Sequence, residues 1–241
     1  MGRERLRRLT LALDCLPRLR EATSSPDIDV AAAATLAELA GADAIRLGVG
    51  EDLRPVSESD VRQARRGARD LELRMPPSQS LLKVALDARP DRVLLAAESR
   101  DGRRPASPLD LRSRALPLGA IVRALAEAGI SAGALVAPDL EAVKIAHGEG
   151  VRGIELFTGA LVDLPVAERR VQVEKLADAV RLAAKLRLAI GLGGGLGFRV
   201  LRELLEAAPA VESVAIGRAA IARAVLVGLD RTVRDLKALI A

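Results

Sequence analysis

Short apolar runs alternate along the chain with longer segments in which apolar residues recur at helical spacing. Such short runs are typical of buried strands, and the longer periodic segments are typical of amphipathic helices. The apolar runs predict eight strands, over residues 9–13, 44–47, 71–75, 92–96, 132–136, 153–157, 187–190 and 213–216. The segments between them predict helices over residues 30–40, 57–69, 79–88, 118–128, 139–149, 164–185, 197–208 and 219–240.

This alternation of strands and helices predicts a closed parallel barrel. Repeated strand–helix units form right-handed parallel crossovers, and eight of them in 241 residues match a single (β/α)8 TIM barrel, with room for extra helices. The alternative is an open doubly wound sheet, which would carry a glycine fingerprint after its first strand. Asp14-Cys15-Leu16-Pro17 stands there instead, so the barrel is favoured. No break in composition divides the chain, and we expect one domain over residues 1–241.

Composition narrows the partners that the chain is expected to bind. The 37 basic and 32 acidic residues give a net charge of +5, and the basic excess is interspersed, which is typical of a solvated surface. The chain has no Trp or Tyr and two Phe, so it lacks the aromatic residues that stack on nucleobases. No apolar run approaches the roughly 20 residues of a membrane span. We therefore expect a cytoplasmic protein that binds neither nucleic acid nor membrane.

The strongest chemical signal is a glycine-rich stretch after the seventh predicted strand. Five of the seven residues from Gly191 to Gly197 are glycines, and a helix is predicted to follow. Glycine lets a backbone approach a ligand closely, and the start of a helix favours anions. The eighth predicted strand likewise ends in Gly217-Arg218. Together these loops predict that Gly194, Gly195, Gly217 and Arg218 bind a phosphate; the alternative is that the glycines only relieve crowding.

Two glutamates interrupt predicted strands and are candidates for acid–base chemistry. Glu72 lies in Leu71-Glu72-Leu73 and Glu155 in Ile154-Glu155-Leu156. A buried carboxylate is costly unless it is paired or used, so we predict that both are catalytic. The alternatives are an ion pair with Arg46 or Arg74, or a position at a strand end that is already exposed to water.

Other residues at predicted strand ends complete the candidate site. Asp14 and Thr158 are expected to contact the ligand, and Glu98 also follows a strand. Cys15 is read as a small buried thiol, and His147, the one histidine, is expected on an outer helix away from the site. With so few Cys and His residues, we expect no bound metal. Residues 97–117 are expected to form an irregular excursion or lid over the site.

Several ordered motifs resemble a known family. They are Leu13-Asp14, Ala40-Gly41-Ala42-Asp43-Ala44-Ile45, Leu71-Glu72-Leu73, Ile154-Glu155-Leu156-Phe157-Thr158-Gly159, Gly193-Gly194-Gly195-Leu196 and Ile216-Gly217-Arg218-Ala219. In these motifs the chain resembles pyridoxine 5′-phosphate synthase, nearly end to end. The resemblance implies a TIM barrel that assembles as a homo-octamer and needs no metal or redox cofactor. It implies condensation of 1-deoxy-D-xylulose 5-phosphate with 3-amino-2-oxopropyl phosphate to give pyridoxine 5′-phosphate.

The chain departs from this family at its histidines and at one phosphate-binding arginine. The family histidines fall on Cys15, Gly48, Pro55, Phe157, Gly194 and Arg218, and the arginine falls on Gly50. Asp14, Glu72, Glu155, Thr158 and Gly217 remain. The sequence therefore predicts a family member that binds a phosphorylated small molecule with weak or altered catalysis. Two alternatives stay open: a synthase that has rebuilt its site with arginines such as Arg54, and a non-catalytic paralogue acting in assembly or regulation.

Overall fold

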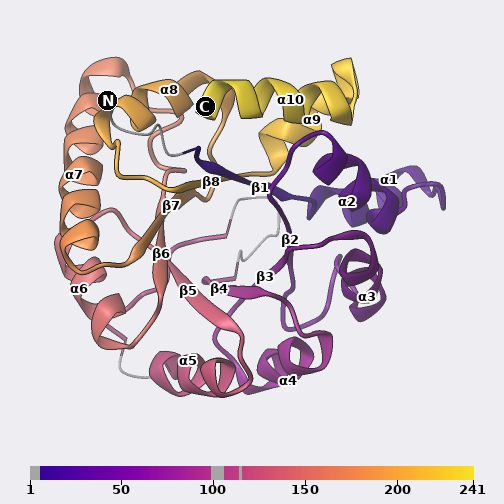
Figure 1. The fold of residues 1–241 in the computed structure, drawn as a ribbon, viewed down its shortest axis with the longest axis horizontal. Coiled ribbons are helices and arrows are strands. Elements are labelled where there is room, and N and C mark those ends of the chain that lie inside the picture. The colour runs from indigo at the N-terminus through magenta and orange to yellow at the C-terminus, as the bar shows by residue number, and fades with distance from the viewer. Residues whose placement is uncertain (1–5, 99–105, 114–115) are drawn as a thin grey trace.

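The computed structural model describes residues 6–98, 106–113 and 116–241, and its strands form a closed parallel barrel (Figure 1). Each strand pairs in parallel with the next, and the eighth pairs with the first, which confirms the predicted (β/α)8 TIM barrel. The strands are β1 (Arg8–Ala12), β2 (Ala44–Gly48), β3 (Leu71–Met75), β4 (Arg92–Leu95), β5 (Ser131–Val136), β6 (Gly153–Phe157), β7 (Ala189–Gly193) and β8 (Ser213–Ile216).

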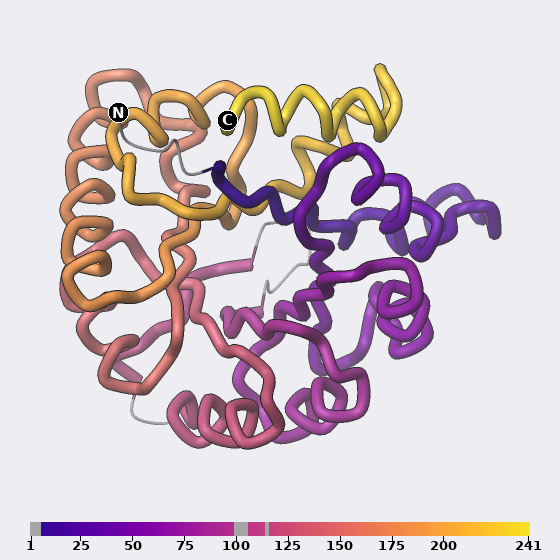
Figure 2. Tube along the Cα trace, in the orientation of Figure 1, coloured from indigo at the N-terminus to yellow at the C-terminus, as the bar shows by residue number. Residues whose placement is uncertain are grey.

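Helices surround this ring of strands. They are α1 (Cys15–Thr23), α2 (Val30–Leu39), α3 (Glu58–Gly67), α4 (Gln79–Ala88), α5 (Leu118–Glu127), α6 (Leu140–Gly148), α7 (Val166–Lys185), α8 (Phe198–Ala207), α9 (Arg218–Val227) and α10 (Leu229–Ile240). Figure 2 shows that α10 completes the ring, and it packs against both α8 and α2. Among the described residues, none of these helices is long and apolar enough to cross a membrane.

The main apolar core lies between the strands and the helices, whereas much of the barrel interior is polar. Alternate strand residues such as Leu9, Leu47 and Leu73 are buried in the outer layer. The inward positions include Arg46, Glu72 and Glu155, which are also buried. Barrel interiors of this type are usually filled by bulky branched side chains. The interior therefore holds charge where apolar packing is the common solution.

Two predicted elements differ from the structure, and one helix was not predicted. The seventh strand begins at Ala189 and runs to Gly193, because Arg187 adopts a left-handed turn with φ 59°. The predicted helix 219–240 is two helices, since Gly228 has φ 85° and ends α9. Helix α1 was not predicted, because Pro17 and a net polar sequence hide its short pattern. Of the predicted excursion 97–117, residues 99–105 and 114–115 lie outside the described part, and Ser107 forms a bridge with Ala97.

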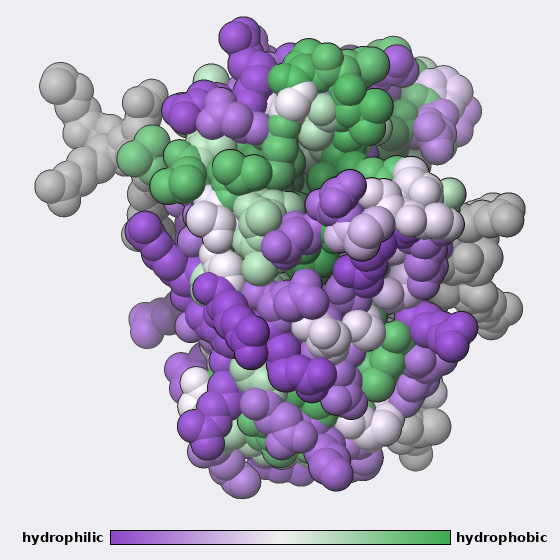
Figure 3. Space-filling view, turned by 90° about the vertical axis from the view of Figure 1, so that its right-hand side faces the viewer, coloured by the Kyte–Doolittle hydropathy of each residue, from purple (hydrophilic) through white to green (hydrophobic). Residues whose placement is uncertain are grey.

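Several of the exposed apolar residues lie on α9 and α2. Figure 3 shows hydrophobic residues concentrated in the upper part of one face, above a largely hydrophilic region. At the end of α9, the exposed fractions of Val225 and Leu226 are 74% and 83%, and Leu39 on α2 is 69% exposed. Apolar surface of this kind is typical of an interaction face. The predicted homo-oligomer stays a prediction.

Candidate functional site

A cavity of about 690 Å³ opens at the carboxyl ends of the strands, where barrel proteins bind ligands. Residues following six of the eight strands line this mouth cavity. They include Asp14 after β1, Gly50 after β2, Pro76 after β3, Glu98 after β4, Gly195 after β7 and Arg218 after β8. Its position and size make it the candidate site of the described residues.

Four residues predicted to bind a phosphate line this same cavity: Gly194, Gly195, Gly217 and Arg218. Gly194 and Gly195 have φ of 73° and 117°, a backbone conformation that side-chain-bearing residues rarely adopt. The first turn of α9 lines the cavity through Arg218, Ala219 and Ala222. The first N–H groups of a helix lack partners within the helix and carry partial positive charge. The β7 and β8 loops thus present features suited to an anion side by side.

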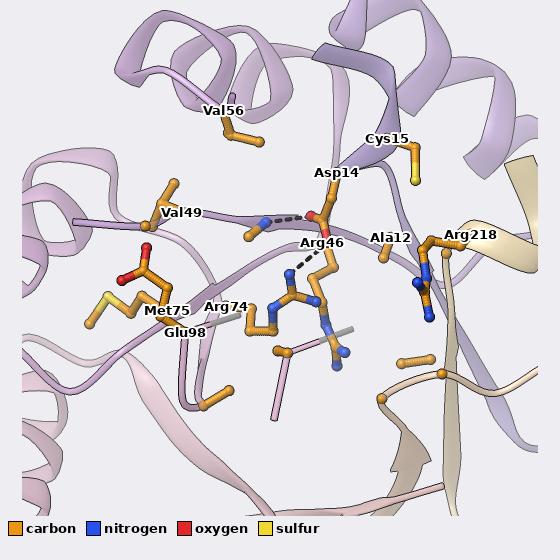
Figure 4. A pocket seen from close by; sticks show the side chains of 18 of the residues that line it. Ala12, Asp14, Cys15, Arg46, Val49, Val56, Arg74, Met75, Glu98 and Arg218 are labelled. Atoms are coloured by element: carbon orange, nitrogen blue, oxygen red, sulfur yellow. Dashed lines mark hydrogen bonds and ion pairs between the residues drawn. The ribbon is translucent and has the colours of Figure 1, made fainter. Parts of the chain in front are cut away.

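Asp14 is held in the mouth by residues of β2 and β3 (Figure 4). Its Oδ1 accepts a hydrogen bond from the Gly48 N–H at 2.5 Å, and its Oδ2 pairs with Nη2 of Arg74 at 2.8 Å. A Cβ atom at Gly48 would collide with the Arg74 guanidinium, so this glycine makes room for the arginine. Asp14 therefore lines the cavity, as predicted, with its carboxylate already engaged.

Arginines dominate the charge of the mouth cavity. Arg18, Arg46, Arg54, Arg74 and Arg218 line it, together with the acids Asp14 and Glu98. Sequence reasoning did not place Arg18 or Arg74 at the ligand. Arg18 lies on the unpredicted helix α1, and Arg74 is two residues from Glu72, so the period-two pattern of a strand could have indicated that it faces inward.

Glu72 and Glu155 lie below this mouth, bound to the buried Arg46. Nε of Arg46 donates to Oε1 of Glu72, while Nη1 and Nη2 donate to the two Glu155 oxygens at 3.0 and 2.5 Å. A Cβ atom at Gly193 would collide with the Glu155 carboxylate, so β7 leaves room for this ion pair. The structure therefore shows that both acids form the ion pair with Arg46 that the sequence analysis gave as an alternative. The catalytic role of the two acids stays a prediction.

The Arg46 cluster separates two cavities. Both acids line a smaller cavity of about 260 Å³ that includes Arg8, Arg92 and Ser213 from the amino-terminal ends of strands. Arg46 lines this cavity and the mouth cavity alike. Burial acts to lower the pKa of Arg46, but Glu155 and Glu72 together outweigh it and hold the pKa above its ordinary value. The cluster is therefore a fixed charged layer across the barrel.

The remaining candidates differ in whether they line the mouth cavity. Thr158 is fully buried, and its hydroxyl and N–H both donate to the Gly193 carbonyl at 2.8 Å, so it supports β7 rather than lining the mouth cavity. Cys15 is partly exposed and lines the cavity, which differs from the expected buried thiol, and burial and then Asp14 raise its pKa. His147 is exposed on α6, as predicted. Within the described ranges, no group of His, Cys, Asp or Glu residues could hold a metal ion.

Comparison with known proteins identifies similar sequences over nearly the whole chain. A family model described as pyridoxal phosphate biosynthesis protein PdxJ matches residues 9–241. Pyridoxine 5′-phosphate synthase from Geobacter metallireducens is 35% identical over 235 residues, which cover 97% of this chain and 98% of that protein. The synthase of the same name from Desulforapulum autotrophicum is 34% identical, with the same two coverages.

Solved structures agree on the fold alone. Tryptophan synthase from M. tuberculosis, in its aminoacrylate-bound form, matches with a TM-score of 0.65 at 14% identity, covering 98% of this chain and 94% of that one. The tryptophan synthase α-subunit from Pyrococcus furiosus matches with a TM-score of 0.60 at 16% identity, covering 100% and 98%. At such low identity the likeness concerns the arrangement of the barrel and nothing of its chemistry.

The buried cluster generates a stability prediction. Arg46→Met leaves Glu72 and Glu155 without their shared partner, and we expect the free energy of unfolding at neutral pH to fall by about 3–5 kcal/mol. Unpaired buried carboxylates have raised pKa values, so the loss should shrink as the pH falls and they take up protons. Chemical denaturation at several pH values measures both effects.

A matched control is Arg62→Met, since Arg62 pairs with Glu58 on the exposed surface of α3. That change should cost about 0.5 kcal/mol or less. Adding Glu72→Gln and Glu155→Gln to Arg46→Met should recover part of the lost stability. A loss below about 1 kcal/mol for Arg46→Met alone would show that the cluster is not what holds the barrel interior together.

Proposed function

This chain belongs to the PdxJ family of pyridoxal phosphate biosynthesis proteins, and from that premise we propose that its mouth cavity binds a phosphorylated small molecule. One observation supports the proposal. The same cavity is lined by Gly194, Gly195, Gly217 and Arg218. Backbone N–H groups at a helix start and a planar guanidinium are a combination that suits a phosphate ester.

The charge of the mouth supports the same ligand class. Apart from Arg46, which Glu72 and Glu155 engage, four arginines line the cavity against Asp14 and Glu98. The imbalance leaves positive charge for an incoming dianion such as a phosphate monoester. Low-dielectric walls around such a cleft strengthen its attraction for an anion.

We propose that this site is derived from one that catalyses the family reaction. Condensing 1-deoxy-D-xylulose 5-phosphate with 3-amino-2-oxopropyl phosphate requires imine formation, proton transfers, eliminations and ring closure. Each positioned acid or base typically contributes about 10²–10⁴-fold to such steps. No histidine lines the described mouth, and Arg46 holds both Glu72 and Glu155. The proposed function is therefore phosphate-ester binding with slow turnover.

A non-catalytic role in assembly or regulation is the second candidate. It is favoured by the ion pairs that Glu72 and Glu155 form with Arg46, since neither acid lines the mouth cavity. Both candidates share the phosphate site and differ only in turnover, so a binding assay tests what they have in common and an activity assay separates them.

Binding can be tested by thermal denaturation in inorganic phosphate. At a phosphate concentration of about ten times Kd, linkage gives about 1.4 kcal/mol, which corresponds to roughly 3–6 °C in Tm for a chain of this size. Arg218→Ala should reduce the shift, measured against its own phosphate-free sample, because the guanidinium contact is lost. Arg62→Ala, on the outer surface, should keep the full shift. An unchanged shift in Arg218→Ala, or none in the wild type, would contradict the proposed site.

Turnover can be tested with both family substrates in a direct assay. We expect kcat/KM at least about 10²-fold below that of the Geobacter metallireducens synthase, since the mouth lacks a histidine among its described residues. We also expect no growth when the gene is placed in a strain that lacks its own synthase. Growth together with a comparable rate would establish a rebuilt active site, and complete inactivity with phosphate binding intact would favour the non-catalytic role.

A further inference from the structure

A second cavity lies at the opposite end of the barrel from the mouth. This lower cavity, of about 260 Å³, is lined by residues of all eight strands, mostly near their amino-terminal ends. We propose that it is a second ligand site, which binds a small oxyanion carried by a phosphate or a carboxylate group. The proposal goes beyond the proposed function, because it concerns a separate space and needs no ligand in the mouth.

Small residues in the second half of the barrel create the lower cavity. Gly133 on β5, Gly153 on β6 and Gly191 on β7 line it. The interior of such barrels is usually filled by bulky branched side chains, which these positions lack. A water molecule takes about 30 Å³ in the liquid, so the space suits an ion of a few heavy atoms together with water.

Two hydroxyl groups of the lower cavity have no hydrogen-bond partner among the described residues. Thr10 is 5% exposed and lines the cavity from β1. Ser213 lines it from β8, in register with Arg8 on one side and Gly191 on the other. A Cβ atom at Gly191 would lie 2.8 Å from the Ser213 Oγ, so this glycine leaves the hydroxyl open to the cavity. A buried hydroxyl without a partner is costly, and a bound group that accepts hydrogen bonds would remove that cost.

Arginines supply the positive charge at the rim of the lower cavity. Arg8, Arg92 and Arg152 line it. Arg8 and Arg92 share the carboxylate of Asp70, at 2.5 and 2.7 Å, and Arg92 also lies 3.5 Å from Glu72. Arg152 is exposed and forms no ion pair with any residue that the structure describes. An unpaired guanidinium beside a pair that shares one acid has N–H donors available for an oxyanion.

The acids that line the lower cavity are engaged by other groups. Glu72 and Glu155 bind Arg46 at the inner end of the cavity, and Glu212 also has an interaction of its own. The charge that a ligand meets at the rim is therefore that of the arginines. A cation entering there would be repelled, whereas an oxyanion would bind the guanidinium groups and the two hydroxyls together.

Methyl NMR of the full chain tests the proposal separately for each cavity. Leu94 and Ala189 line the lower cavity, whereas Val49 and Met75 line the mouth. We expect inorganic phosphate and succinate, titrated separately, to give saturable shifts at Leu94 and Ala189. The probe that saturates at the lower concentration identifies the preferred anionic group. Sodium chloride at the same ionic strength should give no saturable shift, because it only screens charge.

Two variants that should keep the fold test the contacts. Thr10→Val keeps the shape of the side chain and removes the hydroxyl, and Arg152→Gln removes an exposed charge. Each should raise the Kd of the lower cavity about fivefold to tenfold, the range for losing one hydrogen bond to a charged group that is partly exposed. Arg66→Gln is the matched control, because Arg66 is an exposed arginine of α3 outside both cavities. It should leave this Kd unchanged.

The outcomes separate this proposal from the proposed function. A lower cavity that holds water alone would give no saturable shift at Leu94 or Ala189, and that result would overturn the proposal. Shifts that chloride reproduces would mean an adventitious ion only, and shifts that survive both Thr10→Val and Arg152→Gln at full affinity would mean binding elsewhere. Either result would overturn the proposal too. Absence of shifts among the methyl groups of the mouth would count against the proposed function alone.

Discussion

The pairing of Arg46 with Glu72 and Glu155 is the constraint on which the rest of the barrel depends. Three charges are buried where barrels usually pack branched apolar side chains, and they are tolerable because each carboxylate accepts hydrogen bonds from one guanidinium. The strands β2, β3 and β6 supply the three residues, so the cluster ties opposite walls of the barrel together. It also lies below the mouth cavity, and it engages the two acids that the sequence offers for catalysis.

Above that cluster, charged side chains from several strand ends line the mouth cavity. The β7 and β8 loops supply glycine backbone and Arg218, and the β4 end supplies Glu98 on the other side. Asp14 and Arg74 form an ion pair between them. The arginines outnumber the acids among the described lining residues, which is the charge balance that the proposed phosphate ligand requires.

The barrel could be predicted from the sequence because strand burial and helical periodicity repeat eight times. The glycine-rich loop of the mouth could also be predicted, since Gly194 and Gly195 adopt a backbone conformation that other residues rarely adopt. The ion pair of Glu155 could not be predicted, because its partner Arg46 lies 109 residues away and the pairing depends on how the barrel closes. Helix α1, and with it Arg18, was missed because Pro17 and polar neighbours weaken a short pattern. Local signals thus predicted the elements, whereas the ion-pair partners of the acids depend on contacts between distant strands.

The glycines of the mouth have a consequence for substitutions in the site. The space that a side chain would take at Gly48, Gly50 or Gly194 is filled by Arg74, Glu98 or Phe157 respectively. At Gly48 and Gly50 a larger residue fits once the flexible end of the neighbouring side chain moves, whereas at Gly194 it would also have to displace the Phe157 ring and adopt a φ of 73°. The effect of a substitution at each of these glycines is therefore coupled to the neighbour that occupies its space.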